Sequence, residues 1–127
     1  MEDEYQYIFS EDIKGSPLDG GKSYKMHLAP KIPASDFWSV IVYDNETNLI
    51  IRNEQLWPSV HSNSKNLVIN PDGSVDVSFG PKSPAGKDNN WVQTNPGKGW
   101  NMILRLYYPQ EPLFNKSWKP GDIEEIK

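Results

Sequence analysis

The sequence predicts an all-β fold, an antiparallel β-sandwich with a jelly-roll-like arrangement of about seven to nine strands. Three observations predict it. Apolar and polar residues alternate with a period of two in several segments, which is typical of strands with one buried face. Nine glycines and eleven prolines among 127 residues supply turns between short strands. No segment sustains the 3.6-residue period of an amphipathic helix, and the chain length fits a single domain over residues 1–127.

The N-terminal part of the chain contains four candidate strands. Residues 5–9 form a first short run, and residues 24–28, YKMHL, alternate regularly between apolar and polar side chains. The segment FWSVIVY, residues 37–43, is apolar at nearly every position, so we expect it at the centre of the fold with both faces covered. The polar turn DNETN, residues 44–48, then leads into a short strand at residues 49–51.

The C-terminal part contains three more. Residues 67–69 and 75–79 flank the turn NPDG, residues 70–73, in which proline suits the second turn position and glycine accepts a positive φ, so we expect a hairpin. Residues 100–108 form the longest run. Its alternation predicts one face with Trp100, Met102, Leu104, Leu106 and Tyr108 and another with Asn101, Ile103, Arg105 and Tyr107. At most a single helical turn is expected, near residues 35–37 or 113–115.

Composition and charge exclude several classes of protein. Without cysteine the chain has no disulfide, thiolate metal site or thiol nucleophile. The net charge is −4, and the basic residues are scattered singly, so we expect no nucleic-acid partner. No apolar run approaches the roughly 18 residues of a membrane span. The N-terminus is acidic where a signal peptide is basic, which predicts a cytoplasmic protein.

Reactive groups are sparse and not arranged in known catalytic patterns. Only two histidines occur, His27 on the polar face of its strand and His61 in a polar segment, so we expect no metal site. No nucleophile elbow accompanies His61, and the glycine-rich pieces do not complete a phosphate loop. Asp72 and Asp76 flank a tight hairpin that points their carboxylates apart, against a calcium site. We therefore predict no catalytic residue and no cofactor.

Arg105 is the most informative polar residue. It lies within the most hydrophobic strand, where a buried guanidinium needs a partner. Asp44 and Asp36, at the ends of the other central strand, are the candidate partners. Two interpretations stay open: a structural bridge between strand and loop, or an anion-binding arginine at the mouth of the sandwich, with Tyr107 on the same strand face.

The five tryptophans divide in the same way. Trp38 and Trp100 lie within strand patterns and are predicted to be core residues. Trp57 and Trp91 lie in predicted loops, so we expect them to be partly exposed and available for binding a protein or a glycan.

Five segments in order along the chain carry a resemblance to a known family: LDGGKSY (18–24), PASDFWSVIVYDNET (33–47), NPDGSVDVSFGPKSPAGKDNNW (70–91), NPGKGWNMILRLYYP (95–109) and WKP (118–120). Together they resemble the DUF1214 domain family. The resemblance implies a β-sandwich that usually follows a second domain, DUF1254, in one longer chain, here as a free-standing domain. Most relatives are bacterial and many are exported. The resemblance implies no established reaction and no catalytic residue.

Two functional hypotheses follow. The first is a non-catalytic module that binds another protein, such as a DUF1254-like domain or a second copy in an oligomer, or a glycan or small ligand; it predicts an exposed apolar patch around Trp57 or Trp91. The second is a cofactor-independent hydrolase or lyase. It requires Asp44 or Asp36 to meet Arg105, His27 or Tyr107 in one concave pocket. We favour the first because the sequence places no nucleophile, base or metal ligands.

Overall fold

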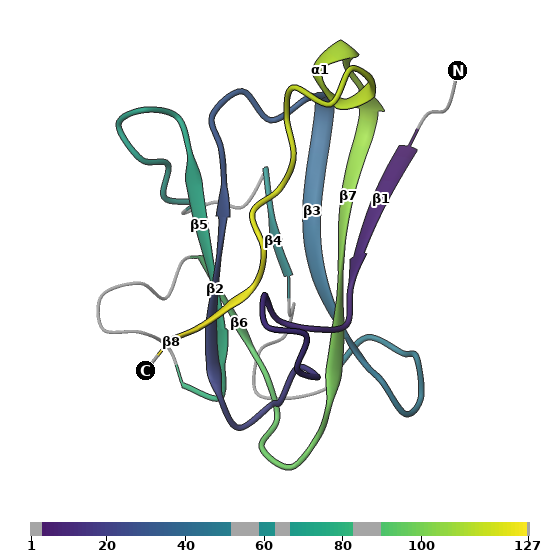
Figure 1. Ribbon diagram of the computed structural model, residues 1–127, viewed down its shortest axis with the longest axis vertical. Helices are drawn as coiled ribbons and strands as arrows, with labels where there is room; N and C mark the ends of the chain where they lie inside the picture. Colours follow the sequence, from purple (N-terminus) through teal and green to yellow (C-terminus); the bar gives the residue numbers. More distant parts are fainter. Residues whose placement is uncertain (1–3, 52–58, 63–66, 83–89, 127) are drawn as a thin grey trace.

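The structure, a computed structural model, describes residues 4–51, 59–62, 67–82 and 90–126, with the backbone alone at residues 35, 36 and 114. Two four-stranded sheets pack face to face in a sandwich, joined by turns and longer connections (Figure 1). The predicted all-β sandwich is confirmed. The jelly-roll-like connection pattern stays a prediction.

The first sheet contains the longest strands. Its order is β1 (Glu4–Phe9), β7 (Trp100–Pro109), β3 (Ala34–Asp44) and β4 (Ser59–His61), and all its pairings are antiparallel. The FWSVIVY segment is a central strand, as predicted, with a neighbour on each edge. Both faces were expected to be covered, but its outward side chains Phe37, Ile41 and Tyr43 are only half-buried. The register between β3 and β7 shifts once, between Ala34 and Phe37.

The second sheet is smaller. Its order is β6 (Trp91–Gln93), β5 (Val75–Gly80), β2 (Ser23–Leu28) and β8 (Glu124–Ile126). The pairings of β2 with β5 and β8 are antiparallel, whereas β5 and β6 run parallel. The turn between residues 69 and 75 forms as predicted, since Gly73 has φ +91° and its N–H donates to the Asn70 carbonyl at 2.8 Å.

The core consists of the side chains that alternate inward from both sheets. At its centre the Trp100 ring from β7 stacks on Phe79 of β5, with ring centroids 5.0 Å apart, and meets Tyr24 of β2 edge-on at 5.6 Å. All three rings are almost completely buried. This contact joins the two sheets through aromatic surface, which is the largest apolar area that single residues can bury.

The C-terminal segment connects the two sheets and adds Leu113, Trp118 and Ile123 to the core. After the single helical turn α1 (Glu111–Phe114), which was expected near residues 113–115, the chain passes from the first sheet to the edge of the second, where it forms β8 (Figure 1). Trp118 is buried on the way, and its indole N–H donates to the Ala29 carbonyl at 3.2 Å. The described residues contain no helix that is long and apolar enough to cross a membrane.

Several predicted elements differ from the structure. Residues 67–69 form no strand, and residues 49–51 contribute only one isolated bridge, between Tyr43 and Ile50. Tyr108 was expected to face inward, but its positive φ of 54° breaks the alternation and leaves the side chain exposed, while Pro109 is buried. Strands β4, β6 and β8 were not predicted, because three residues are too few to establish a period of two.

Gly20 provides a test of how tightly the connection before β2 is packed. A Cβ atom at Gly20 would overlap the Asn95 carbonyl and lie 2.7 Å from the Lys98 carbonyl oxygen. Both are backbone atoms that cannot rotate away, so Gly20→Ala should lower the free energy of unfolding by about 3 kcal/mol or more. Gly21→Ala is the matched control, because its Cβ meets only ordinary contacts at 3.4 Å and beyond. Urea denaturation measures both variants, and equal stability of the two would contradict the packing.

Candidate functional site

The outer face of the first sheet is unusually apolar for a surface that faces away from the core. Cross-strand register places Ile8, Ile103 and Ile41 side by side in one row across β1, β7 and β3. A second row contains Phe37 beside Tyr107, with ring centroids 5.4 Å apart. Ile8 is exposed, and the other side chains of these rows are half-buried. We call these residues, with Tyr43 and Arg105, the outer face of β7: Ile8, Phe37, Ile41, Tyr43, Ile103, Arg105 and Tyr107.

Arg105 lies at the centre of this face and is held by neighbouring strands. One of its terminal nitrogens, Nη2, donates to the Tyr43 hydroxyl at 3.1 Å, and Nε lies 3.6 Å from a carboxylate oxygen of Glu4. The Glu4 and Arg105 side chains are about one-third exposed, 32% and 29%, so the pair contributes at most about 1 kcal/mol. The partners are therefore Glu4 and Tyr43, and the position is the middle of the sheet, not the mouth of the sandwich.

The outer face of the second sheet has the opposite character. The side chains that point outward include Lys25, His27, Asp76 and Glu124, and Lys25 is paired in register with Glu124. His27 Nδ1 lies 2.7 Å from Asp76 Oδ1, and the other Asp76 oxygen accepts from Asn70 Nδ2 at 3.1 Å. This is the mixed-charge surface typical of a sheet that faces water.

Partial burial alone would raise the pKa of Asp76. The hydrogen bonds from His27 and Asn70, together with the charges of His27 and Lys25, outweigh that effect and lower the pKa below its ordinary value. The carboxylate is therefore stabilised in its ionised form by the folded structure.

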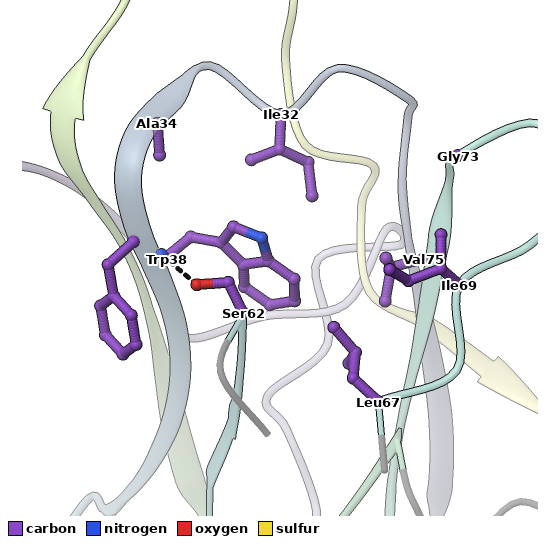
Figure 2. Close-up of a pocket in the computed structure, with 9 residues that line it drawn as sticks. Ile32, Ala34, Trp38, Ser62, Leu67, Ile69, Gly73 and Val75 are labelled. Carbon is purple, nitrogen blue, oxygen red and sulfur yellow. Dashed lines mark hydrogen bonds between the residues drawn. The ribbon is translucent and has the colours of Figure 1, made fainter. Parts of the chain in front are cut away.

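A pocket of about 260 Å³ lies between the sheets at the end where β3 and β5 begin. Figure 2 shows the Trp38 indole projecting from β3 into this space, with Ile32 above it and Val75, Ile69 and Leu67 on the opposite side. Ser62 is anchored below Trp38 by two hydrogen bonds: its Oγ accepts from the Trp38 backbone N–H at 3.1 Å, and its own N–H donates to the Trp38 carbonyl at 2.9 Å.

Of the two predicted partners of Arg105, the structure describes the side chain of Asp44 alone, and it lies away from the guanidinium. Asp44 is paired in register with Trp100, five positions along β7 from Arg105, and its side chain lies 3.9 Å from the Lys98 amine. Asp36 lies in β3 at the register shift, and its side chain is outside the described part. Tyr107 shares the outer face with Arg105, as the alternation predicts.

Trp57 and Trp91 were both predicted to lie in loops and to be partly exposed. Trp57 lies outside the described residues. Trp91 is half-buried in β6, and its indole N–H donates to the Gly80 carbonyl at 3.0 Å, so its polar edge is already bonded. An exposed apolar patch was expected around Trp57 or Trp91. The apolar rows of the first sheet lie on the opposite side of the sandwich from Trp91.

The grouping required by the enzyme hypothesis is not formed by the described side chains. His27 lies on the outer face of the second sheet, whereas Arg105 and Tyr107 lie on the outer face of the first. Among the residues that the structure describes, no three histidine, aspartate or glutamate side chains are placed to hold a metal ion.

Sequence reasoning missed the pocket. Its lining comes from segments far apart in the chain: the connection before β3, strands β3 to β5, and the 67–73 loop. The sequence contained one indication of it: Leu67, Val68 and Ile69 are three consecutive apolar residues, and the structure places them in neither sheet. Val68 and Ile69 are 49% and 58% exposed beside the pocket.

Residues 3–111 match the model of a family described as a protein of unknown function, DUF1214. The chain belongs to this family. Among solved structures, the DUF1214 chain is similar to the VPA0106 protein from Vibrio parahaemolyticus, with a TM-score of 0.83 and 23% identity over 98% of this chain and 31% of that one. It is also similar to a putative uncharacterized protein from Burkholderia cenocepacia, with a TM-score of 0.56 and 19% identity over 98% of this chain and 36% of that one.

These two likenesses show the fold alone. The DUF1214 chain spans about a third of the length of each of the two solved chains. No curated protein matches it.

The lowered pKa of Asp76 predicts a pH-dependent contribution to stability. A depressed pKa in the folded state stabilises the protein above the unfolded value near 3.8, and this contribution is lost as pH falls through the lower folded pKa. Asp76→Asn should therefore lower the urea midpoint at pH 5 and have a smaller effect at pH 2.5. Asp122→Asn, at an exposed aspartate outside this pair, is the control and should give equal midpoints to the wild type. An Asp76→Asn effect that persists undiminished at pH 2.5 would contradict the assignment.

Proposed function

We propose that this DUF1214 chain is a non-catalytic assembly module that docks a second protein domain through the outer face of β7. The observation that carries the proposal is the contrast between the two outer faces. The described outward side chains of one sheet are mostly charged or polar, with Lys25, His27, Asp76 and Glu124 beside Ile126. On the other sheet three isoleucines and three aromatic rings surround a smaller polar group that includes Glu4, Gln6 and Arg105. Protein surfaces that bind partners differ from ordinary surface chiefly by depletion of charge and enrichment in aromatic residues and arginine.

The composition of the outer face of β7 fits the centre of an interface. Tyrosine and arginine are the residue types whose truncation most often weakens binding strongly, and this face has Tyr43, Tyr107 and Arg105. The Arg105–Tyr43 hydrogen bond holds both side chains in place before a partner arrives, which reduces the entropy lost on binding. The isoleucine row supplies apolar area around this polar centre.

A second domain is the occupant that the comparisons favour. The solved relatives contain this fold as about a third of their length, so in those proteins the sandwich is part of a larger chain. We infer that a domain of the kind that makes up the rest of those chains covers the outer face of β7, in the same chain or in a separate one. A second copy of this chain is the competing occupant.

Two other functions receive less support. A glycan platform requires an exposed indole, and Trp91 is half-buried with its N–H bonded to Gly80. A hydrolase or lyase with a carboxylate and an arginine would rely on Glu4 and Arg105, the pair that the structure does bring together. That pair lies on a sheet face away from the described pocket, so a substrate bound there stays in contact with water.

Site-specific photocrosslinking tests the docking face. With p-benzoylphenylalanine in place of Tyr107, the DUF1214 chain expressed in its source cells should form one major adduct with one protein. The same photocrosslinker in place of Ile126, on the second sheet, should form none. The proposal is supported if the adducted protein also binds the purified chain one to one in solution. Adducts at both positions, no adduct at Tyr107, or an adduct only with a second copy would overturn it.

Two isoleucine variants give a quantitative prediction for that complex. Ile8→Glu places a charge in the apolar row at a residue that is 68% exposed, so folding should be unaffected while binding weakens about tenfold or more. Ile126→Glu is the matched control, because Ile126 is also exposed but belongs to the second sheet. Isothermal titration calorimetry measures affinity, and thermal unfolding confirms that both variants fold. Equal affinities for the two variants would contradict the assignment.

A further inference from the structure

The pocket between the sheets has a chemical character distinct from both outer faces. Nine described residues line it, of which seven are apolar and none is charged. Among them Ser62 has a hydroxyl, which accepts a hydrogen bond from the Trp38 backbone and retains its own proton to donate. A charged ligand would lose its hydration in this pocket without gaining an ionic partner, so the lining favours a neutral molecule.

The mouth of the pocket is also apolar. Ile69 lines the space and is 58% exposed, and its neighbour Val68 is 49% exposed. Large apolar side chains with this degree of exposure gain free energy when an apolar group covers them. Opposite them, the Trp38 indole is nearly buried and forms one wall of the pocket (Figure 2).

The size of the pocket limits its occupant. A dry cavity of about 150 Å³ lined by similar residues is sufficient for one benzene molecule. A volume of about 260 Å³ therefore admits one ring or two fused rings, and it lies below the roughly 300 Å³ at which pockets for drug-sized ligands begin. An oligosaccharide does not fit.

We propose that this pocket is a binding site for one small neutral aromatic molecule. The Trp38 ring meets the ligand, because paired aromatic rings attract each other beyond the effect of area burial. The Ser62 hydroxyl is available to a hydrogen-bond acceptor or hydroxyl group on the ligand. The site differs from the docking surface proposed above, since it lies between the sheets. Phe37 borders both, and the other described lining residues lie outside the outer face of β7.

Titration of the full chain with four small probes of similar size, followed by ¹H–¹⁵N NMR, tests the site. Benzyl alcohol should cause saturable shifts centred on the Trp38 indole N–H, Ser62 and Val75. Benzoate and benzylammonium should bind about tenfold more weakly or not at all, because the pocket offers their charges no partner. Cyclohexylmethanol, the saturated counterpart, should bind about two- to tenfold more weakly if Trp38 selects an aromatic ring.

Two pairs of variants locate the binding. Ala34→Leu fills the pocket and should abolish the benzyl alcohol shifts, whereas Ala29→Leu, at a partly buried alanine outside the lining, should not. Because either core variant can disturb folding, a second pair uses exposed positions. Ile69→Lys places a charge at the mouth and should weaken binding about fivefold or more, while Ile126→Lys, at an exposed isoleucine on β8, should have no effect.

Four results would overturn the proposal: no saturable shifts in the wild-type chain, shifts centred away from the pocket, charged probes that bind as tightly as benzyl alcohol, or unchanged binding in folded Ala34→Leu and Ile69→Lys. Equal binding of cyclohexylmethanol would overturn the aromatic selectivity.

Discussion

The contact on which the rest of the structure depends is the packing of Trp100 against Phe79 and Tyr24, because it joins the two sheets at the centre of the core. A fully buried aromatic ring removes roughly 150–250 Å² from water, which at about 25 cal/mol per Å² is about 4–6 kcal/mol. The Trp100 indole N–H is buried with no hydrogen-bond partner among the described residues, at a cost of about 1–3 kcal/mol. The free energy gained by burying the indole ring exceeds the cost of its unpaired N–H. A smaller residue at this position would avoid the unpaired donor but leave a cavity.

The set of β7 side chains that faces the core determines which residues remain accessible for binding. On β7 the residues from Trp100 to Leu106 alternate, and those of the inward set are fully buried. Only the outward set and the ends of the sandwich remain accessible. Arg105 belongs to the outward set, so its charge never enters the core, and a half-exposed pair with Glu4 is sufficient to accommodate it. Next to Arg105 the outward neighbours in register are the polar Gln6 and Ser39, but the rows on either side include Ile8, Ile41, Ile103, Phe37 and Tyr107. Folding does not require these apolar side chains on an outward face, which is the reason to assign the face to binding.

The sequence predicted the parts of the fold that are determined locally. The segments at 24–28, 75–79 and 100–108 alternate clearly, and residues 5–9 form a short run. Each of the four is a strand within one or two residues of its predicted bounds. The candidate site was less predictable, because it depends on register between distant segments. Asp44 was predicted as a partner of Arg105 because it lies at the end of β3, but the β3–β7 register places it beside Trp100. Glu4 becomes the partner because β1 pairs along β7, a contact between the two ends of the chain that no local pattern shows.

The pocket arises where the regular pattern ends. The shift of register between Ala34 and Phe37 interrupts the start of β3, and the turn at Gly73, which has a positive φ, returns the chain towards β5. Gly73 and Val75 both line the pocket. The Trp38 side chain projects into the pocket between these segments. These features belong to loops and to the end of a strand, so residues that line the pocket can be substituted without disturbing the Trp100 contact. The positions on the outer face of β7, in contrast, are set by the same alternation of side chains that builds the core. Two surfaces with such different constraints are suited to two separate roles.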